Sequence, residues 1–260
     1  MSGGLHLEAA GHGPPLVLLH GWAMHSGVWG GLSATLARRR RVHAVDLPGH
    51  GWSPARPPFT AEAIVRSLDA AFAGEPQPLT VLGWSLGGQL AIAWALARPE
   101  RVARLVLVGT TPRFAAADGW DCALSAQTLA RFGDELHVSW RATVLRFLTL
   151  QMRGGEHGHA ALAALRRELF ARGEPSRPLL RDALALLAAT DLREAVGRVA
   201  QPALVVAGGR DTLAPAAAGR WLAGALPQGR FLAIEGAAHV PFLSHPAEFE
   251  RALAAFLDEL

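Results

Sequence analysis

The sequence predicts an α/β fold in which a mostly parallel central sheet is flanked by helices and carries an all-helical cap insertion. Two observations lead to this prediction. Short apolar runs of strand length alternate with helical patterns, which is typical of parallel strands covered on both faces. Between 113 and 190 this alternation stops, and only helical spacing remains. We therefore expect a core formed by 1–112 and 191–260, with a helical cap at 113–190.

The expected strands are rich in Leu, Val and Ile and are bounded by Gly, Pro or charged residues. In chain order they span 16–19, 42–46, 79–82, 105–108, 203–207 and 231–234. Within the cap, the spacing of Val144, Phe147 and Leu148 favours an amphipathic helix, and so does the later spacing of Leu162 and Leu165.

Composition limits the classes of function. The 25 basic residues are all Arg, and with 22 acidic residues they give a formal net charge of +3, which is too weak to indicate nucleic-acid binding. No apolar run approaches the roughly 20 residues of a membrane span, and the N-terminus lacks a secretory signal. Cys122 is the single cysteine, which fits a reducing compartment. We expect a cytoplasmic monomer that binds neither nucleic acid nor a membrane.

Basic residues gather in the predicted cap. Between 141 and 181 only three acids occur, against Arg141, Arg146, Arg153, Arg166, Arg167, Arg172, Arg177 and Arg181. Two interpretations stay open here: a positive surface that attracts an acidic partner, or the solvated faces of helices in an Arg-rich protein.

A Gly-Trp-Ser-Leu-Gly motif at 83–87 lies between a predicted strand and a predicted helix. This context is the one in which a GxSxG sequence presents a nucleophilic serine. The glycines fit a sharp turn, because side chains at Gly83 and Gly87 would collide with neighbouring backbone. The free N–H groups at the start of the helix point to where negative charge develops. Ser85 is therefore the candidate nucleophile, although a purely structural turn also explains many GxSxG sequences.

Two loops after late strands supply candidates for the other catalytic groups. Asp211 follows the strand at 203–207, and His239 follows the strand at 231–234. Both lie at carboxyl ends of strands, where open α/β sheets build their sites, and the chain order Ser, Asp, His is a known order for a catalytic triad. We expect His239 to take the proton of Ser85, while Asp211 orients the imidazole and stabilises its charged form.

Other histidines and acids suit these roles less well. His245 precedes a proline that begins a helix, so we expect it to cap that helix. Asp191 precedes a helical pattern and is interpreted as an N-cap. His157 and His159 form a short His-rich patch, but without further ligands at metal spacing they indicate a solvated loop.

A His-Gly-Trp sequence at 20–22 directly follows the first expected strand. The backbone N–H groups of Trp22 and Leu86 are the candidate oxyanion hole, because a tetrahedral intermediate needs donors beside the nucleophile. His20 is expected to be a structural hydrogen-bonding group. The Gly-rich sequence that starts at Asp46 is interpreted as a shaped turn, since it lacks the glycine spacing and the Lys of a phosphate-binding loop.

Seven motifs extend over nearly the whole chain. They are His-Gly-Trp at 20–22, Asp-Leu-Pro-Gly-His-Gly at 46–51, Gly-Trp-Ser-Leu-Gly-Gly at 83–88, Arg-Pro-Glu-Arg-Val at 98–102, Phe-Leu-Thr-Leu-Gln at 147–151, Thr-Asp-Leu-Arg at 190–193 and His-Val-Pro-Phe-Leu-Ser-His-Pro-Ala-Glu-Phe at 239–249. By these motifs the chain resembles the family of pimeloyl-[acyl-carrier protein] methyl ester esterases of biotin biosynthesis, in the α/β-hydrolase superfamily.

The resemblance implies the α/β-hydrolase fold and a role for each matched position. Ser85, Asp211 and His239 correspond to the family's triad, and Trp22 and Leu86 to its oxyanion and substrate contacts. A cap segment of the family lines the acyl site beside the triad, and its counterpart consists of Phe147, Leu148, Thr149, Leu150 and Gln151.

The resemblance also implies a protein partner. In the family, arginines of the cap hold the acidic acyl carrier protein that bears the substrate. Arg146 aligns well with one of them, and Arg141, Arg166 and Arg167 correspond by region.

The implied reaction is a two-step ester hydrolysis that requires no metal and no organic cofactor. Ser85 attacks the methyl ester carbonyl, His239 protonates the departing methanol, and water activated by His239 then releases the carboxylate. Two other interpretations stay open. One is a broad-specificity short-chain carboxylesterase or carbon–carbon bond hydrolase of the same fold, and the other is a non-catalytic ligand-binding protein that keeps the fold.

Overall fold

A seven-stranded sheet with the order β1-β3-β2-β4-β5-β6-β7 forms the centre of the computed structural model, which describes residues 4–259. The strands are β1 (Leu7–Ala10), β2 (Pro15–Leu19), β3 (Arg41–Val45), β4 (Leu79–Trp84), β5 (Val102–Val108), β6 (Ala203–Gly208) and β7 (Gly229–Ile234). Only β1 runs antiparallel to its neighbour; the other pairs are parallel. The predicted fold class is confirmed.

All six predicted strands are present, and the sequence missed only β1. Strands β2 and β4 are buried at every position, so their continuous apolar runs were visible in the sequence. Strand β1 lies at the edge of the sheet and is largely exposed. It has no apolar run, because an edge strand with exposed side chains does not need one.

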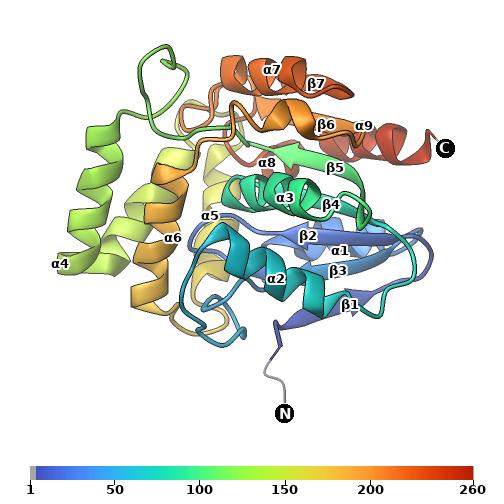
Figure 1. Ribbon diagram of the computed structural model, residues 1–260. Coiled ribbons are helices and arrows are strands. Elements are labelled where there is room, and N and C mark those ends of the chain that lie inside the picture. Colours follow the sequence, from blue (N-terminus) through green and yellow to red (C-terminus); the bar gives the residue numbers. More distant parts are fainter. Residues whose placement is uncertain (1–3, 260) are drawn as a thin grey trace.

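Helices cover both faces of the sheet (Figure 1). In the core they are α1 (Gly30–Leu36), α2 (Ala61–Ala71), α3 (Leu86–Ala97), α7 (Ala216–Ala225), α8 (Pro241–Ser244) and α9 (Pro246–Asp258), with 3-10 turns η1 (Ser26–Trp29) and η2 (Val196–Arg198). Helices α2 and α3 lie on one face, and α1 and α9 on the other. Helix α3 is buried nearly all round, since it packs between the sheet and α2.

Three further helices form a layer beyond the carboxyl ends of the strands (Figure 1). They are α4 (Ala126–Gln151), which is kinked at Ser139, α5 (Gly158–Leu169) and α6 (Arg177–Ala189). All three fall inside the predicted cap interval, and none of the helices in the described range 4–259 is both long enough and apolar enough to cross a membrane.

The prediction that 113–190 is helical throughout is wrong for its first part. Residues 113–125 form an irregular loop, in which Gly119 has a φ of +69° and the Trp120 indole donates to the Arg113 carbonyl at 2.9 Å. A glycine in this conformation ends regular structure, and side-chain bonds to the backbone then replace those of a helix.

The predicted helix after Asp191 is also absent. The chain makes turns before the short η2, and the carboxylate of Asp191 binds the Arg193 backbone N–H at 3.2 Å and the side chains of Arg113 and Arg193. Local bonds of this kind compete with helix formation. Asp191 therefore joins two ends of the cap interval through ion pairs.

Candidate active site

Ser85 lies on the sharp turn between β4 and α3. Its φ of +56° and ψ of −117° fall outside the regions that L-residues normally occupy. The turn is fixed at both ends, because the Ser85 N–H donates to the Val108 carbonyl at 2.9 Å and its own carbonyl accepts from the Gly88 N–H at 2.9 Å. Strain held in this way is typical of functional sites.

Two glycines make this turn possible. A Cβ at Gly83 would lie 2.3 Å from the Gly87 carbonyl oxygen, and one at Gly87 would lie 2.2 Å from the Leu19 carbonyl oxygen. Both distances are below any tolerable contact, so the backbone of β4 and α3 approaches that of β2 only without side chains. The collisions expected from the sequence are therefore present in the structure.

The loops after β6 and β7 bring Asp211 and His239 together. The Nδ1 of His239 and the Oδ2 of Asp211 are 2.7 Å apart, and both side chains are buried. A carboxylate only accepts, so Nδ1 donates and Nε2 keeps a free lone pair. The other oxygen, Oδ1, accepts from the N–H groups of Leu213 and Ala214 at 2.8 and 3.0 Å. Asp211 is thus held on both oxygens, which fixes the imidazole.

The backbone of His239 connects the loop after β7 to the cap. Its N–H donates to the Gln151 carbonyl at 3.0 Å, and its carbonyl accepts from the Trp84 indole at 3.0 Å. Its Nε2 is buried and has no hydrogen-bond partner within residues 4–259. These contacts place the imidazole between the residue before Ser85 and the end of α4, with its basic nitrogen available to a reacting hydroxyl. This contact to Gln151 leaves no signal in the sequence, because it uses a backbone carbonyl.

The two proposed oxyanion donors are both unused. In the described range 4–259, neither the Trp22 nor the Leu86 backbone N–H donates to a protein acceptor. Leu86 is the first residue of α3, where helix N–H groups lack internal partners and the helix dipole favours negative charge. The Trp22 side chain is occupied elsewhere, since its indole donates to the Leu180 carbonyl at 2.8 Å.

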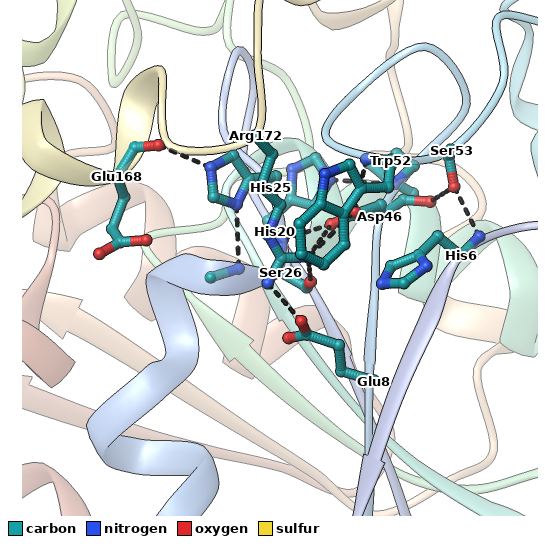
Figure 2. Close-up of polar contacts among 12 residues, drawn as sticks. His6, Glu8, His20, His25, Ser26, Asp46, Trp52, Ser53, Glu168 and Arg172 are labelled. Atoms are coloured by element: carbon teal, nitrogen blue, oxygen red, sulfur yellow. Dashed lines mark hydrogen bonds and ion pairs between the residues drawn. The ribbon is translucent and has the colours of Figure 1, made fainter.

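Asp46 organises the loop that carries Trp22 (Figure 2). Its fully buried carboxylate accepts from the N–H groups of Ser26 at 2.7 Å and Trp52 at 2.9 Å. Burial alone would raise the pKa of Asp46, but interaction with His20 and these N–H groups lower it below the ordinary value. The Gly-rich sequence at 46–53 is therefore a shaped turn, as predicted. Its first residue, Asp46, accepts from the Ser26 N–H and so connects the turn to the loop that carries Trp22.

Arg172, in the loop after α5, reaches from the cap into this network (Figure 2). Its guanidinium lies 3.1 Å from Asp46, 2.6 Å from Glu8 and 2.7 Å from the Ser26 hydroxyl, and it stacks over the Trp52 ring. Only 9% of its side chain is exposed. Arg172 is thus not part of the positive surface that the basic stretch suggested. Its ion pairs with Asp46 and Glu8 connect the cap to the core instead.

His20 and His50 are buried beside this network. The Nδ1 of His20 donates to the Gly21 carbonyl at 2.8 Å and its Nε2 accepts from the Leu47 N–H at 3.0 Å, so the ring is a structural hydrogen-bonding group. Burial lowers the pKa of His20 to about 3 and that of His50 to about 4. Both imidazoles are therefore neutral at neutral pH and have a structural role.

The segment 147–151 divides between two environments, because consecutive residues of a helix face different directions. Phe147, Leu148 and Gln151 are buried, and the Phe147 ring packs edge-on against Trp22 with 4.8 Å between centroids. Thr149 is exposed, and Leu150 is half-buried. Phe147 therefore packs against the loop that carries Trp22, Leu148 and Gln151 are buried in the interior, and Thr149 is left on the outer side of α4.

The four candidate arginines of the cap are exposed but not equally free. Arg146 pairs with Glu135, and Arg141 pairs with Glu174 and lies over the Trp140 ring. Arg166 donates to the Thr149 hydroxyl at 3.3 Å, and the Arg167 guanidinium lies 3.7 Å from Glu168. Arg146 also borders a groove of about 550 Å³ that is lined by Thr149, Leu150, Arg153, His157, His159 and neighbouring residues.

Comparison with known proteins identifies relatives of this site and fold. The family model described as the alpha/beta hydrolase fold matches residues 14–246. A pimeloyl-[acyl-carrier protein] methyl ester esterase from Chromobacterium violaceum is 44% identical over 98% of this chain and 98% of its own length, and one from Nitrosomonas europaea is 42% identical over 94% and 96%. An esterase structure from Exiguobacterium antarcticum superimposes with a TM-score of 0.91 at 20% identity, covering 98% of this chain and 96% of its own.

The buried histidines predict that acid destabilises the protein. The pKa of His50 is about 4 when folded and 6.5 when exposed, so the unfolded chain binds the proton first, and stability falls as the pH drops from about 6.5 toward 4. At pH 5, proton uptake by His50 in the unfolded chain lowers the free energy of unfolding by on the order of 1–2 kcal/mol. The measurement is the free energy of unfolding in urea at pH 5 and at pH 7. The loss of stability between these pH values should be smaller for His50→Gln than for the parent, and for the exposed His12→Gln it should equal that of the parent. Equal losses in all three proteins would refute this prediction.

Arg172→Met should destabilise the protein by about 3 kcal/mol, because it leaves the Asp46 carboxylate buried without its cation. The matched control is Arg167→Met, which removes a side chain that is 73% exposed and should stay within about 0.5 kcal/mol of the parent. Both values come from urea unfolding at pH 7. A loss below 1 kcal/mol for Arg172→Met would show that the pair does not hold the cap.

Proposed function

We propose that this chain, which belongs to the α/β-hydrolase family and within it to the family of pimeloyl-[acyl-carrier protein] methyl ester esterases, hydrolyses the methyl ester of a pimeloyl chain carried by acyl carrier protein. The products are pimeloyl-[acyl-carrier protein] and methanol, and the reaction belongs to biotin biosynthesis. The observation that carries this proposal is the identity of 41–44% with relatives of that name over nearly the full length of both chains.

The proposed chemistry uses the groups at the carboxyl edge of the sheet. His239 Nε2 accepts the proton of Ser85 as its oxygen attacks the ester carbonyl. The charged imidazole that forms is stabilised by Asp211, which contacts Nδ1 at 2.7 Å. The oxyanion is bound by the backbone N–H groups of Trp22 and Leu86, which have no competing acceptor in the described range. Methanol then leaves with the proton of His239, and water repeats the sequence on the acyl-enzyme.

Apolar side chains around Trp22 suit the acyl part of this substrate. A pimeloyl chain is a run of methylene groups between two carbonyl carbons, so an apolar wall favours it. Phe147 packs against Trp22, and Leu148, the next residue of α4, is fully buried. Gln151 offers a buried side-chain oxygen without a partner within residues 4–259, which allows the amide to orient a polar end. Leu150, half-buried, borders the groove outside, and Ser85 and His239 complete the proposed site.

The outer surface of α4 and α5 fits the carrier protein. Arg166 donates to the hydroxyl of the exposed Thr149, and Arg146 and Arg153 line the groove that Thr149 borders. Acyl carrier protein is acidic, so this surface would steer it toward the site. Arg167 is open to the same partner, whereas Arg141 is engaged by Glu174 and aromatic rings, and Arg146 by Glu135 and the Phe132 ring. A cytoplasmic location and a monomeric state stay predictions.

Loss of the nucleophile should abolish hydrolysis of the carrier-bound methyl ester. For Ser85→Ala we expect a decrease in kcat on the order of 10⁶, as is typical of triad nucleophiles. Asp211→Asn should be folded but severely impaired, since it permits the wrong tautomer of His239. The assay measures methanol release from methyl pimeloyl-[acyl-carrier protein], with the exposed Ser125→Ala as the control.

Activity of the parent on short p-nitrophenyl esters, without activity on the carrier-bound ester, would favour a general short-chain esterase. Expression in a biotin auxotroph that lacks the pathway esterase tests the same point in the cell. The parent should restore growth and Ser85→Ala should not. No growth with the parent despite soluble expression would overturn the biotin assignment while leaving the esterase chemistry intact.

The arginines should affect the carrier-bound substrate alone. We expect the double variant Arg146→Ala/Arg166→Ala to raise KM for the carrier-bound ester by about fivefold at low ionic strength, less in high salt. Its kcat/KM for p-nitrophenyl acetate should be unchanged. Arg38→Ala, an exposed change outside the cap, is the matched control. An equal loss on both substrates would indicate that these arginines support the fold of the cap rather than the partner.

A further inference from the structure

We propose that Glu156, His157 and His245 form a binding site for a divalent transition-metal ion such as Zn²⁺, separate from the triad. One ligand atom from each side chain lies within 4.8 Å of the others. Glu156 and His157 belong to the loop between α4 and α5, and His245 lies between α8 and α9. An ion bound here would therefore join the cap to the core.

His245 presents the nitrogen that a metal needs. Its Nδ1 lies 2.9 Å from the Ser244 hydroxyl, which itself donates to the Val240 carbonyl at 3.2 Å. The hydroxyl proton is thus used, so Nδ1 donates to Ser244 and Nε2 carries the lone pair. A ligating histidine usually has its other ring nitrogen bonded in this way. Although His245 occupies the N-cap position of α9, as predicted, it makes no capping bond with its side chain.

Glu156 directs one oxygen to the same point. Its Oε1 accepts from Arg210 at 2.9 Å, which orients the carboxylate and leaves Oε2 for a ligand. A Cβ at Gly236 would lie 2.7 Å from this Oε2 and 2.8 Å from His245 Nε2. The two atoms therefore converge over Gly236, whose carbonyl also accepts from the Glu156 N–H at 2.8 Å. The absence of a side chain at Gly236 leaves the space between them open.

His157 completes the set from the other side. Its φ of +53° and ψ of 15° place it in the left-handed region, which is uncommon for a residue with a side chain. It precedes α5 but does not cap it, and within residues 4–259 its ring has no hydrogen-bond partner. The ring instead packs edge-on against His245, with 5.4 Å between centroids. This backbone conformation therefore turns an unbonded imidazole toward the other two ligands.

Two imidazoles and one carboxylate favour Zn²⁺ over Mg²⁺ or Ca²⁺, which prefer oxygen ligands. Zinc binds these groups at about 2.0–2.2 Å in a tetrahedral arrangement whose fourth position water can fill. To bind the ion, the three ligand atoms, which now lie within 4.8 Å of one another, would have to move closer together. His159, two residues beyond His157, is not among the converging ligands. The partners of His157 are its neighbour Glu156 and His245, which is distant in the chain, so the patch that the sequence indicated as a solvated loop contributes one ligand.

Such an ion would act next to the catalytic loop. Gly236 lies three residues before His239 in the same loop, and the His239 N–H already contacts the cap at Gln151. A metal held by Glu156, His157 and His245 would add a second link between this loop region and the cap. We expect the ion to stabilise the packing of the cap on the core. This is a structural role and not part of ester hydrolysis.

The test uses the full chain without a polyhistidine tag, freed of metal by a chelator. Titration with Co²⁺ should give one equivalent with the strong visible absorption of a tetrahedral site, and Zn²⁺ should displace it. Glu156→Gln, at an exposed position, and His245→Ala should each weaken binding by at least about tenfold. Gly236→Ala keeps all three ligands but fills the space between them, so it should cause a similar loss.

His159→Ala is the matched control and should bind as the parent does. Zn²⁺ should also raise the Tm of the parent and of His159→Ala, but not that of Glu156→Gln, since only a protein that binds the ion is stabilised. Equal affinity of the parent, Glu156→Gln and His245→Ala would overturn the proposal, and so would an octahedral Co²⁺ spectrum. These measurements do not depend on esterase activity. A result that contradicts the metal site therefore leaves the proposed function untouched, and loss of the proposed function would leave the metal site untouched.

Discussion

The strained turn at Ser85 is the constraint on which the rest of the candidate site depends. Its positive φ marks the sharp junction of β4 and α3, so that α3 begins at the next residue, Leu86, whose N–H has no acceptor in the described range 4–259. The turn exists only because Gly83 and Gly87 let three backbone segments come into contact that any Cβ would keep apart. Moving one of these segments would displace the candidate nucleophile and the candidate oxyanion donor together.

Hydrogen bonds to the backbone hold the other candidate catalytic groups in place relative to this turn. Trp84, the residue before Ser85, donates its indole proton to the carbonyl of His239, and the N–H of His239 donates to Gln151 at the end of α4. The imidazole therefore occupies a position shared by the sheet and the cap. Asp211 then has only to fix its rotation, which it does from a carboxylate held by two N–H groups.

Charge has two separate uses in the cap. Arg172 is withdrawn from solvent into the Asp46 network, where it holds the cap over the loop that bears Trp22. Arg146 and Arg166 stay exposed on α4 and α5, where Arg146 pairs with Glu135 and Arg166 donates to the Thr149 hydroxyl. Arginines from one basic stretch therefore divide between stabilising the structure and presenting a positive surface, according to which face of the chain each one occupies.

The sequence by itself determined the α/β-hydrolase fold, the strands with continuous apolar runs and the turn at Ser85, because these depend on local patterns and on glycines at fixed spacing. It missed β1, whose exposed residues leave no apolar signal, and it predicted helix where side chains of Trp120 and Asp191 bind the backbone instead. Only the tertiary structure decided that Arg172 is buried, that Thr149 faces outward, and that His157 meets His245 rather than His159. These outcomes depend on contacts between residues distant in the chain, and no local pattern records them.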